Sequence, residues 1–343
     1  MKPLLVREPC PVCGATPDLE LSRVPDPLGL SEEAFTLSRC SSCSLVSTQP
    51  RPDADSLGLY YQDVYSGHGG DEMHDAQTNQ GLWYVNEARW KIIEPHASLG
   101  TEDRVLDVGC GYGAWLAFLY GRTGSQLFGL DADAGSVERN LCKDHGTLMV
   151  AELEEAAFPP GHFAMVSMMH SLEHMRDPVA TLREIRRVLV PGGLALVEVP
   201  NFGSLLRPVF GRHWFPLLVP QHLQHFEQAS LRRAFERAGF DQILVLRAAW
   251  CPAELILSLG PILGRSMGMP TPREADPSRL AAKLITLFLA VAFVLVDLPL
   301  SVLSKLMGRS GNLVALARAP AHSTETPEPG TIQNTSATEA HEP

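Results

Sequence analysis

Two pairs of cysteines near the start of the chain have the spacing of a metal site. Two residues separate Cys10 from Cys13, and two separate Cys40 from Cys43. This spacing lets both thiolates of a pair face one ion, and the 26 residues between the pairs suit a small ribbon that brings four sulfurs into a tetrahedron. Four thiolates leave no open coordination position. The pattern therefore predicts a structural zinc ion, with redox-active or merely buried thiols as the alternative.

A glycine-rich turn indicates a ligand that touches the backbone. In RVLDVGCGYGAWLAFLY (104–120) a short apolar run gives way to apolar residues at helical spacing, and Gly109 and Gly111 lie between the two patterns. Glycines at such a turn let a ligand approach and leave helix N–H groups free to bind it. The next predicted strand ends in Asp131, whose carboxylate suits the two hydroxyls of a ribose.

Asp107 helps to choose between two nucleotide-type cofactors. GCGYGA also satisfies the dinucleotide pattern, which is weak on its own. A carboxylate two residues before Gly109 would repel a pyrophosphate, but it suits a ligand that carries an ammonium and a sulfonium. The sequence therefore favours S-adenosylmethionine. An NAD-dependent oxidoreductase and a glycine turn without a ligand are the alternatives.

Histidines after two predicted strands are candidates for acid–base chemistry. Methyl transfer is an in-line displacement in which positioning supplies much of the catalysis, and a base is needed only when the acceptor must lose a proton. HSLEH provides His170 with Glu173 and His174, and VPQHLQHFE provides His222 and His225. A pKa near neutrality makes histidine a natural base.

These side chains also have other interpretations. Glu173 and His174 would cap and orient the turn before the helix expected in MRDPVATLREIRRVL, and His222 and His225 would share a helical face or pack beside a buried phenylalanine. A further alternative is that His170, Glu173 and His174 hold a divalent ion that orients a catechol-like acceptor.

These motifs follow one another along the chain in the order found in a known family. From about residue 80 to 319 the chain resembles the class I S-adenosylmethionine-dependent methyltransferases. DVGCGYG is similar to their first motif, AELEEAAFPPGHFAMVSMMHSLEHMRDP to their adenine-side acid, fourth strand and following loop, and LVPGGLALVEVPN to their fifth strand. The resemblance implies a doubly wound α/β fold with a seven-stranded, mostly parallel, Rossmann-like sheet. It implies these cofactor contacts: Asp107 at the methionine end, Gly109, Gly111, Asp131, Glu152, and Leu153 beside the adenine.

The N-terminal segment extends the resemblance. CPVCG…CSSC followed by LYYQDVY resembles a zinc-containing segment fused ahead of many such enzymes, including some that act on nucleotide-linked sugars and other small metabolites. Its tyrosines, from Tyr60 to Tyr65, would cover the cofactor pocket or join the two parts. Two positions depart from the family, Ala164 in the "FD" pair and Glu227 at a helix cap, and we expect a local cost there without loss of activity.

A long apolar stretch precedes the last expected strand. DQILVLRA (241–248) and GNLVALARA (311–319) are expected as strands, and in the resembling family they are antiparallel neighbours. The segment 249–310 is then an insertion whose two ends lie on the same side of any membrane. Its charge-free run 284–296 gives about 20 Å of helix, whereas a bilayer core needs about 20 residues. We expect an apolar helical hairpin in peripheral contact with the cytoplasmic leaflet, with a helical lid as the alternative.

Composition limits the partners. Of the 343 residues, 28 are basic and 39 acidic, and the net charge of −11 would repel a phosphate backbone, so we expect no nucleic-acid partner. No export signal is visible, which favours a cytoplasmic protein, peripheral or monotopic on the inner face of the membrane. The expected organisation is a zinc-ribbon segment (1–65), a methyltransferase domain (66–319) with the insertion, and a disordered tail (320–343).

The combined prediction is methyl transfer from S-adenosylmethionine to a small or lipid-linked metabolite of sugar or isoprenoid type. His222 or His225 would be the general base, with His170 as a further catalytic candidate. The non-enzymatic alternative is a methyltransferase-like scaffold that recruits partners through its zinc ribbon. The acceptor atom (oxygen, nitrogen or carbon) and the oligomeric state stay open.

Overall fold

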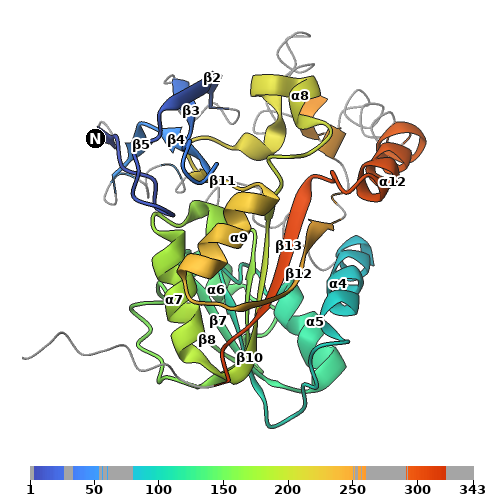
Figure 1. Cartoon of the computed structure of the whole chain (residues 1–343). Coiled ribbons are helices and arrows are strands. Elements are labelled where there is room, and N and C mark those ends of the chain that lie inside the picture. The colour runs from blue at the N-terminus through green and yellow to red at the C-terminus, as the bar shows by residue number, and fades with distance from the viewer. Residues whose placement is uncertain are drawn as a thin grey trace, which may run out of the picture.

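The computed structural model describes residues 4–26, 34–53, 80–249, 254–255, 257–259 and 293–321, with Ser56, Tyr60, Cys251 and Val291. Most of the predicted insertion, nearly all of the predicted tail, and Tyr61 and Tyr65 lie outside these residues. Figure 1 shows a small N-terminal sheet above one end of a larger α/β domain. The proposed division at residues 65 and 66 stays a prediction, because it falls in a segment that is not described.

The larger domain is built on a seven-stranded sheet with the strand order β12-β13-β10-β9-β6-β7-β8. The strands are β6 (Arg104–Val108), β7 (Gln126–Asp131), β8 (Gly146–Val150), β9 (Phe163–Met169), β10 (Leu189–Pro200), β12 (Gln242–Ala249) and β13 (Asn312–Arg318). The five strands from β10 to β8 pair in parallel, whereas β13 lies antiparallel between β10 and β12. This arrangement confirms the predicted seven-stranded, mostly parallel fold.

Helices cover both faces of this sheet. One face carries α4 (Gln80–Ile93) and α5 (Ala114–Thr123), and the other carries α7 (Pro178–Val188) and α9 (Gln228–Arg237), as Figure 1 shows. The strands are apolar on both faces, as expected for parallel strands. Val105 packs in the cluster beneath α4 and α5, while its neighbour Leu106 packs in the cluster beneath α7 and α9. The alternation of side chains along a strand thus supplies two cores from one apolar run.

Two helix starts differ from the expected caps. Asp177 caps α7 by accepting hydrogen bonds from the N–H groups of Val179 at 3.1 Å and Ala180 at 2.9 Å. Glu173 therefore lies outside the helix, in the short 3₁₀ turn η2 (Leu172–His174). At α9 the departure Glu227 forms a reciprocal capping box with a serine at the third helical position, so the missing Ser or Thr is replaced.

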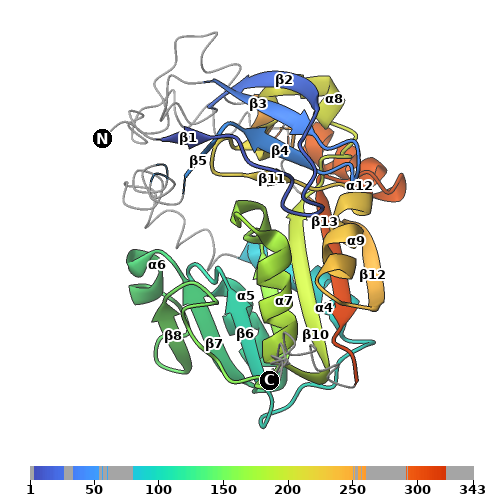
Figure 2. The ribbon, with the colours of Figure 1, turned by 60° about the vertical axis from the view of Figure 1, so that its left-hand side comes forward.

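The small sheet has the order β11-β4-β3-β2, and its strands are β2 (Leu19–Pro25), β3 (Ala34–Arg39), β4 (Val46–Gln49) and β11 (Gln224–His225). A two-stranded ribbon of β1 (Leu5–Val6) and β5 (Arg51–Pro52) accompanies it. Figure 2 shows β11 lying along β4, although β11 belongs to the chain of the larger domain. The N-terminal part is thus joined to the larger domain by a shared sheet.

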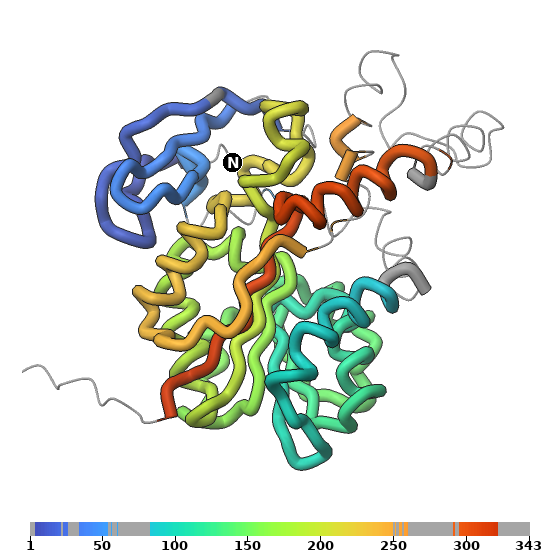
Figure 3. Tube along the Cα trace, turned by 45° about the vertical axis from the view of Figure 1, so that its right-hand side comes forward, coloured from blue at the N-terminus to red at the C-terminus, as the bar shows by residue number. Residues whose placement is uncertain are grey.

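Short helices follow β10 and precede β13. They are α8 (Arg207–Phe210), η3 (Gly211–His213), η4 (Phe215–Leu217), η5 (Phe293–Asp297) and α12 (Leu298–Leu306), and α6 (Ala134–Glu138) follows β7. Figure 3 shows α12 leading into the start of β13, which places it at the carboxyl edge of the parallel strands. Among the described residues, no helix has both the length and the apolarity to cross a bilayer.

Candidate active site

The glycine turn lies at the carboxyl end of β6, the middle one of the five parallel strands. Gly109 and Gly111 have positive φ angles of +77° and +49°, which glycine adopts readily. A Cβ on Gly109 would lie 2.6 Å from Cβ of Ser171, so this position allows a close approach of the turn to the loop after β9. A Cβ on Gly111 would have no atom of the described residues within 4 Å. The backbone at Gly111 is therefore open to a ligand.

Two carboxylates flank this turn. Asp107, 2% exposed, accepts a hydrogen bond from Ser167 Oγ at 2.6 Å. Burial raises the pKa of Asp107 to about 7, although Ser167 and the Arg89 guanidinium oppose the rise. Asp131 at the end of β7 accepts a hydrogen bond from the Gly111 N–H at 2.8 Å, and burial raises its pKa as well. Both acids would be favoured in the ionised form by a cationic ligand.

The residues expected beside an adenine follow the next strand. Glu152 keeps an exposed surface just beyond β8, but the partial loss of solvent around its carboxylate and two neighbouring glutamates raise its pKa. Leu153 is 2% exposed and packs in the cluster beneath α7. Since β6, β7 and β8 are adjacent and parallel, the residues at their carboxyl ends lie along one edge of the sheet. The predicted cofactor residues are thus placed in a single row.

The loop HSLEH, directly after β9, is fixed against the glycine turn. Ser171 Oγ donates a hydrogen bond to the carbonyl of Val108 at 2.7 Å, and the N–H of His170 donates to the carbonyl of Glu198 at 2.8 Å. His170 has a positive φ of 55°, which is uncommon for a residue other than glycine. The conformation at His170 is therefore held by bonds to two neighbouring strands.

His170 lies between two acids. Its Nδ1 is 3.5 Å from Glu173 Oε1 and its Nε2 is 3.4 Å from Glu198 Oε1, which are ion-pair distances. Burial lowers the pKa of His170, but the two carboxylates outweigh burial and raise it to about 9. His170 is consequently protonated at neutral pH in the ligand-free protein.

A network that the sequence analysis missed supports this histidine. Arg89 on α4 donates to Glu198 Oε2 at 2.7 Å, and Asn312 Nδ2 donates to Glu198 Oε1 at 2.7 Å. Burial opposes ionisation of Glu198, but Arg89 and His170 outweigh it and hold the pKa of Glu198 well below its usual range. In the sequence, this network is indicated by Glu198, the acidic residue that interrupts the apolar run LALVEVP.

His222 reaches the same loop from the chain after β10. Its Nε2 is 3.9 Å from Glu173 Oε1, and its Nδ1 is 2.8 Å from the carbonyl of Pro216. The ring of His222 lies edge-on to that of His174, with 4.7 Å between centroids. Burial and the nearby histidines hold the pKa of His222 well below its usual value, so this side chain is neutral.

His225 has different surroundings, although it follows His222 by only three residues. It lies on β11, and its Nε2 is 3.0 Å from Thr48 Oγ1 on β4. Burial and the charge of Arg207 lower the pKa of His225 to about 3. The structure thus brings His170 and His222 together around Glu173, while it places His225 at the joint with the small sheet.

The four predicted cysteine ligands converge. Cys10 Sγ lies 3.4 Å from Cys43 Sγ, Cys13 Sγ lies 3.4 Å from Cys40 Sγ, and the four sulfurs lie within 4.8 Å of one another. The two pairs occupy matching turns, in which the N–H of the fourth residue after the first cysteine donates to that cysteine's carbonyl at 2.8 Å. A tetrahedral zinc site with bonds of about 2.3 Å needs sulfurs about 3.8 Å apart, so the four-cysteine cluster fits zinc.

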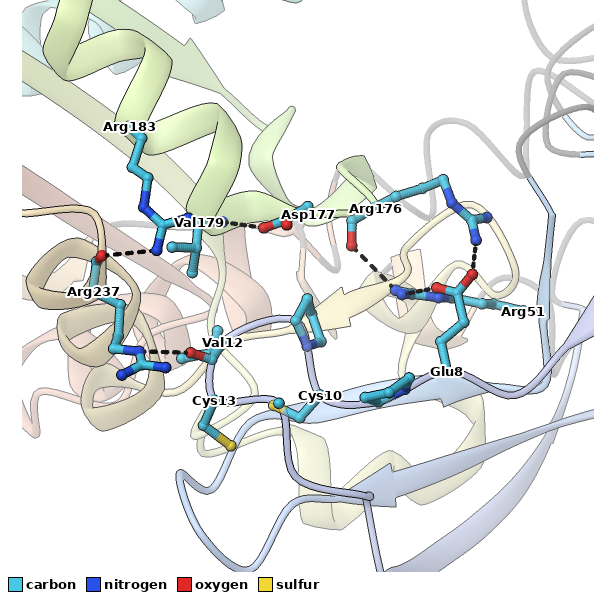
Figure 4. A pocket seen from close by; sticks show the side chains of 13 residues that line it. Glu8, Cys10, Val12, Cys13, Arg51, Arg176, Asp177, Val179, Arg183 and Arg237 are labelled. Carbon is cyan, nitrogen blue, oxygen red and sulfur yellow. Dashed lines mark hydrogen bonds and ion pairs between the residues drawn. The ribbon is translucent and has the colours of Figure 1, made fainter. Parts of the chain in front are cut away.

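A cavity of about 470 Å³ separates this four-cysteine cluster from the start of α7 (Figure 4). Arg51 and Arg176 project into the same region, and Glu8 forms ion pairs with both. Arg237 on α9 donates a hydrogen bond to the carbonyl of Val12 at 3.2 Å. These contacts bind the N-terminal part to the outer face of the larger domain.

Comparison with known proteins shows similarity to methyltransferases. A family model described as a methyltransferase domain matches residues 86–245. A ubiquinone biosynthesis O-methyltransferase of Nitrosospira multiformis is 31% identical over 193 residues, which cover 52% of this chain and 79% of that protein. One of Thiobacillus denitrificans is 29% identical over 206 residues, which cover 57% of this chain and 88% of that protein.

A solved structure agrees at the level of the fold. Phosphoethanolamine N-methyltransferase 2 of Haemonchus contortus, in complex with S-adenosyl-L-methionine, gives a TM-score of 0.53 at 19% identity, covering 80% of this chain and 63% of that one. The sheet, the glycine turn and these relatives agree that the chain belongs to the class I S-adenosylmethionine-dependent methyltransferases. It is an enzyme that transfers a methyl group from S-adenosylmethionine to a small-molecule acceptor.

Proposed function

We propose that the acceptor atom is a hydroxyl oxygen of a small metabolite with an apolar, isoprenoid-type portion. The single observation that carries the proposal is the contact between the cofactor turn and the HSLEH loop, where Ser171 hydrogen-bonds to Val108 at 2.7 Å. This contact supports a position of His170 and Glu173 beside the methyl group that the cofactor would present. The relatives named as O-methyltransferases support oxygen as the acceptor.

The cofactor contacts follow from the row of residues at the sheet edge. The carboxylate of Asp107 would balance the ammonium of the methionine moiety, and the open backbone at Gly111 would lie along the ligand. Asp131 would exchange its bond to the Gly111 N–H for the ribose hydroxyls. Glu152 and Leu153 would lie at the adenine.

The acid–base role falls to His222 and His170. With its Nδ1 facing the carbonyl of Pro216, His222 keeps its proton on Nδ1 and its lone pair on Nε2, toward Glu173. The Glu173 carboxylate would stabilise the imidazolium that forms when His222 takes a proton. His225, the other predicted base, is bound to Thr48, so we propose a supporting role for it.

A second cavity offers a place for the apolar part of the acceptor. It has a volume of about 280 Å³ and lies between α4, the end of β12 and the end of α12. Val85, Ile92 and Leu306 line it together with the Arg89–Glu198 pair. Because Glu198 also contacts His170, this cavity adjoins the proposed acceptor site.

We also propose that zinc fills the four-cysteine cluster as a structural ion. Burial raises the pKa of Cys10 to about 11, and a bound cation would reverse this by stabilising the thiolate. The closed donor set leaves no position for a substrate. Zinc would hold the two cysteine turns together and so fix the small sheet on which β11 pairs.

The proposal of peripheral contact with the cytoplasmic leaflet rests on α12. Its side chains Leu303 and Leu306 are 49% and 81% exposed, and Met307 just beyond the helix is 53% exposed. Lys305 lies among them and would meet acidic lipid headgroups. The test is co-sedimentation of the full chain with vesicles containing anionic lipid. Binding that Leu303→Glu abolishes would support the proposal, and a protein that stays in the supernatant would contradict it.

The test of the enzymatic proposal starts from the cofactor. A calorimetric titration of the purified protein with S-adenosylhomocysteine should show binding in the micromolar range, with NADH as the control ligand that does not bind. Radiolabelled methyl transfer is then screened with hydroxylated acceptors that carry or lack an isoprenoid chain. Methylation confined to amines, or to acceptors without the apolar chain, would contradict the proposed acceptor class.

A further inference from the structure

The Glu173 side chain has an unusual environment for a buried carboxylate. It is 0% exposed, and within the described part of the chain neither of its oxygens has a hydrogen-bond partner. Two histidine nitrogens lie near its Oε1, namely His170 Nδ1 at 3.5 Å and His222 Nε2 at 3.9 Å. Both distances are beyond ordinary hydrogen-bond length. A buried carboxylate without hydrogen bonds is strongly disfavoured unless a cation neutralises it.

Two histidines next to this carboxylate are held in the form that binds metals. His174 Nδ1 lies 3.0 Å from the carbonyl of Gln221, and His222 Nδ1 lies 2.8 Å from the carbonyl of Pro216. Because a carbonyl only accepts, Nδ1 donates in each ring, which makes Nε2 the nitrogen that would face a metal ion. Metal-ligating histidines characteristically donate their second N–H to such an acceptor.

We propose that Glu173, His174 and His222 bind one divalent transition-metal cation, to which the hydroxyl oxygen of the acceptor adds as a further ligand. One ligand atom from each residue lies within 4.8 Å of the other two. Around a tetrahedral ion the oxygen and nitrogen ligands are about 3.4 Å apart, so the 3.9 Å between Glu173 and His222 closes with a small side-chain movement.

The backbone holds this cluster of Glu173, His174 and His222 in place. The N–H of Leu223 donates to the carbonyl of Glu173 at 2.9 Å, which ties the segment carrying His222 to the HSLEH loop. Thr48, which lies on β4 of the small sheet, donates a hydrogen bond from Oγ1 to the carbonyl of His222 at 2.7 Å. The three side chains thus come from two segments that meet before any ion binds.

An ion pair between His170 and Glu173 does not replace the cation. His170 lies toward Oε1, and Oε2 also has no hydrogen-bond partner in the described residues. Two imidazoles and one carboxylate form a mixed nitrogen and oxygen donor set that leaves coordination positions open, as catalytic sites require. This set differs from the His170–Glu173–His174 set considered from the sequence, because His222 replaces His170.

The ion would activate the acceptor in the proposed methyl transfer, on which this inference rests. Binding of the hydroxyl oxygen to the cation lowers its pKa, and the proton is released to water. The oxygen then forms a bond to the methyl carbon while the carbon–sulfur bond breaks, and the electron pair stays on sulfur as S-adenosylhomocysteine. When the ion is bound, His222 acts as a ligand in place of the base role described above, because the cation itself activates the hydroxyl.

Manganese(II) is a suitable probe because it prefers nitrogen and oxygen ligands to the thiolates of the four-cysteine cluster. The full chain, loaded with zinc at those cysteines, is titrated with Mn²⁺, and the free ion is quantified by its electron paramagnetic resonance signal. We expect one Mn²⁺ per chain. Glu173→Gln and His222→Gln should each weaken Mn²⁺ binding at least tenfold. His225→Gln is the matched control for binding, since its ring contacts Thr48 instead.

A calorimetric titration with S-adenosylhomocysteine on the same samples separates this inference from the proposed function. Retained S-adenosylhomocysteine binding in Glu173→Gln, together with lost Mn²⁺ binding, supports the metal site and shows that the variant is folded. A wild-type protein that binds S-adenosylhomocysteine but no Mn²⁺ overturns the metal site alone. Mn²⁺ binding that is unchanged in both variants also overturns it. Failure to bind S-adenosylhomocysteine would instead count against the methyltransferase function.

Discussion

The four-cysteine cluster and the cluster of Glu173, His174 and His222 are assembled in opposite ways. Each cysteine pair occupies one tight turn, and the two turns have the same hydrogen bonds. The second cluster takes two neighbouring residues from the loop after β9 and a third from a segment 48 residues later, joined by the bond between Leu223 and Glu173. Local geometry builds the first cluster, whereas the tertiary fold builds the second.

The two clusters also differ in how completely their ligands would surround an ion. Four thiolates complete a tetrahedron and exclude a substrate, whereas one carboxylate and two imidazoles leave positions open. The cysteine turns lie on the outer face of α7 and α9, and the second cluster lies beside the glycine turn at the carboxyl edge of the sheet. We therefore expect the first cluster to govern stability and the second to govern turnover.

The largest expected effect is on stability. Replacing Cys40 by serine removes one of four ligands, and because metal binding in such ribbons is coupled to folding, the free energy of unfolding should fall by more than about 4 kcal/mol. Denaturant unfolding followed by circular dichroism, with zinc content from mass spectrometry, measures this. Cys142→Ser is the control, because Cys142 is a buried thiol outside the cluster, and about 1 kcal/mol is expected there. Equal losses in both variants would remove the distinction between the two clusters.

The second prediction separates His222 from His225, which occur in one short motif. His222→Gln should reduce turnover by about a hundredfold or more, because either a base or a metal ligand is lost. His225→Gln should stay within about fivefold, the equivalent of the one hydrogen bond to Thr48. Single-turnover methyl transfer is the measurement, with the affinity for S-adenosylhomocysteine as the control that neither variant should change. A larger loss in His225→Gln would return the catalytic role to that residue.

The third prediction concerns Asp107, whose pKa burial raises from its ordinary value of 3.8 to about 7. In the ligand-free protein the folded state therefore holds the proton more tightly than the unfolded state, and this contribution to stability is lost as pH rises from about 4 through 7. Cofactor binding has the opposite dependence, because the ammonium requires the carboxylate. Affinity for S-adenosylhomocysteine should rise between pH 6 and 8.

Calorimetry at several pH values checks this, with Asp107→Asn as the variant. At pH 8 the variant should bind about tenfold more weakly, the equivalent of one charge-assisted hydrogen bond, and its affinity should not change through pH 7. A wild-type affinity that is flat from pH 6 to 8 would show that Asp107 is already ionised before the ligand binds.

The difference between the two clusters also explains which features of the fold and the site could be predicted from the sequence. The cysteine pairs, the glycine turn with Asp107 and Asp131, and the strand β12 at one end of the sheet follow from spacing and periodicity, which are local properties. Even the antiparallel β13 was predicted, through the order of the family's motifs.

The Glu198 network could not be predicted in this way. Its partners Arg89 and Asn312 come from positions that are more than a hundred residues away, and no local pattern relates them. The contrast between His222 and His225 was equally inaccessible, because the pairing of β11 with β4 decides it. Side chains that depend on which segments meet in the fold require the structure.

The smallest predicted effect tests whether the small sheet influences the cluster of Glu173, His174 and His222. Thr48 on β4 donates to the carbonyl of His222 at 2.7 Å and lies 3.0 Å from His225 Nε2, so it joins the small sheet to the segment carrying both histidines. Thr48→Val keeps the volume and removes the hydroxyl, and the free energy of unfolding should fall by about 1 kcal/mol. Ser47→Ala is the control, because successive side chains of a strand point to opposite faces.

If the small sheet only stabilises the protein, turnover in Thr48→Val should match that of Ser47→Ala once both are fully folded. We expect instead a decrease of a few-fold in Thr48→Val with unchanged zinc content, since His222 loses one of the contacts that orient it. Such a result would show that the small sheet acts on catalysis through the bond from Thr48 to the carbonyl of His222. Equal turnover in the two variants would confine the role of the small sheet to stability.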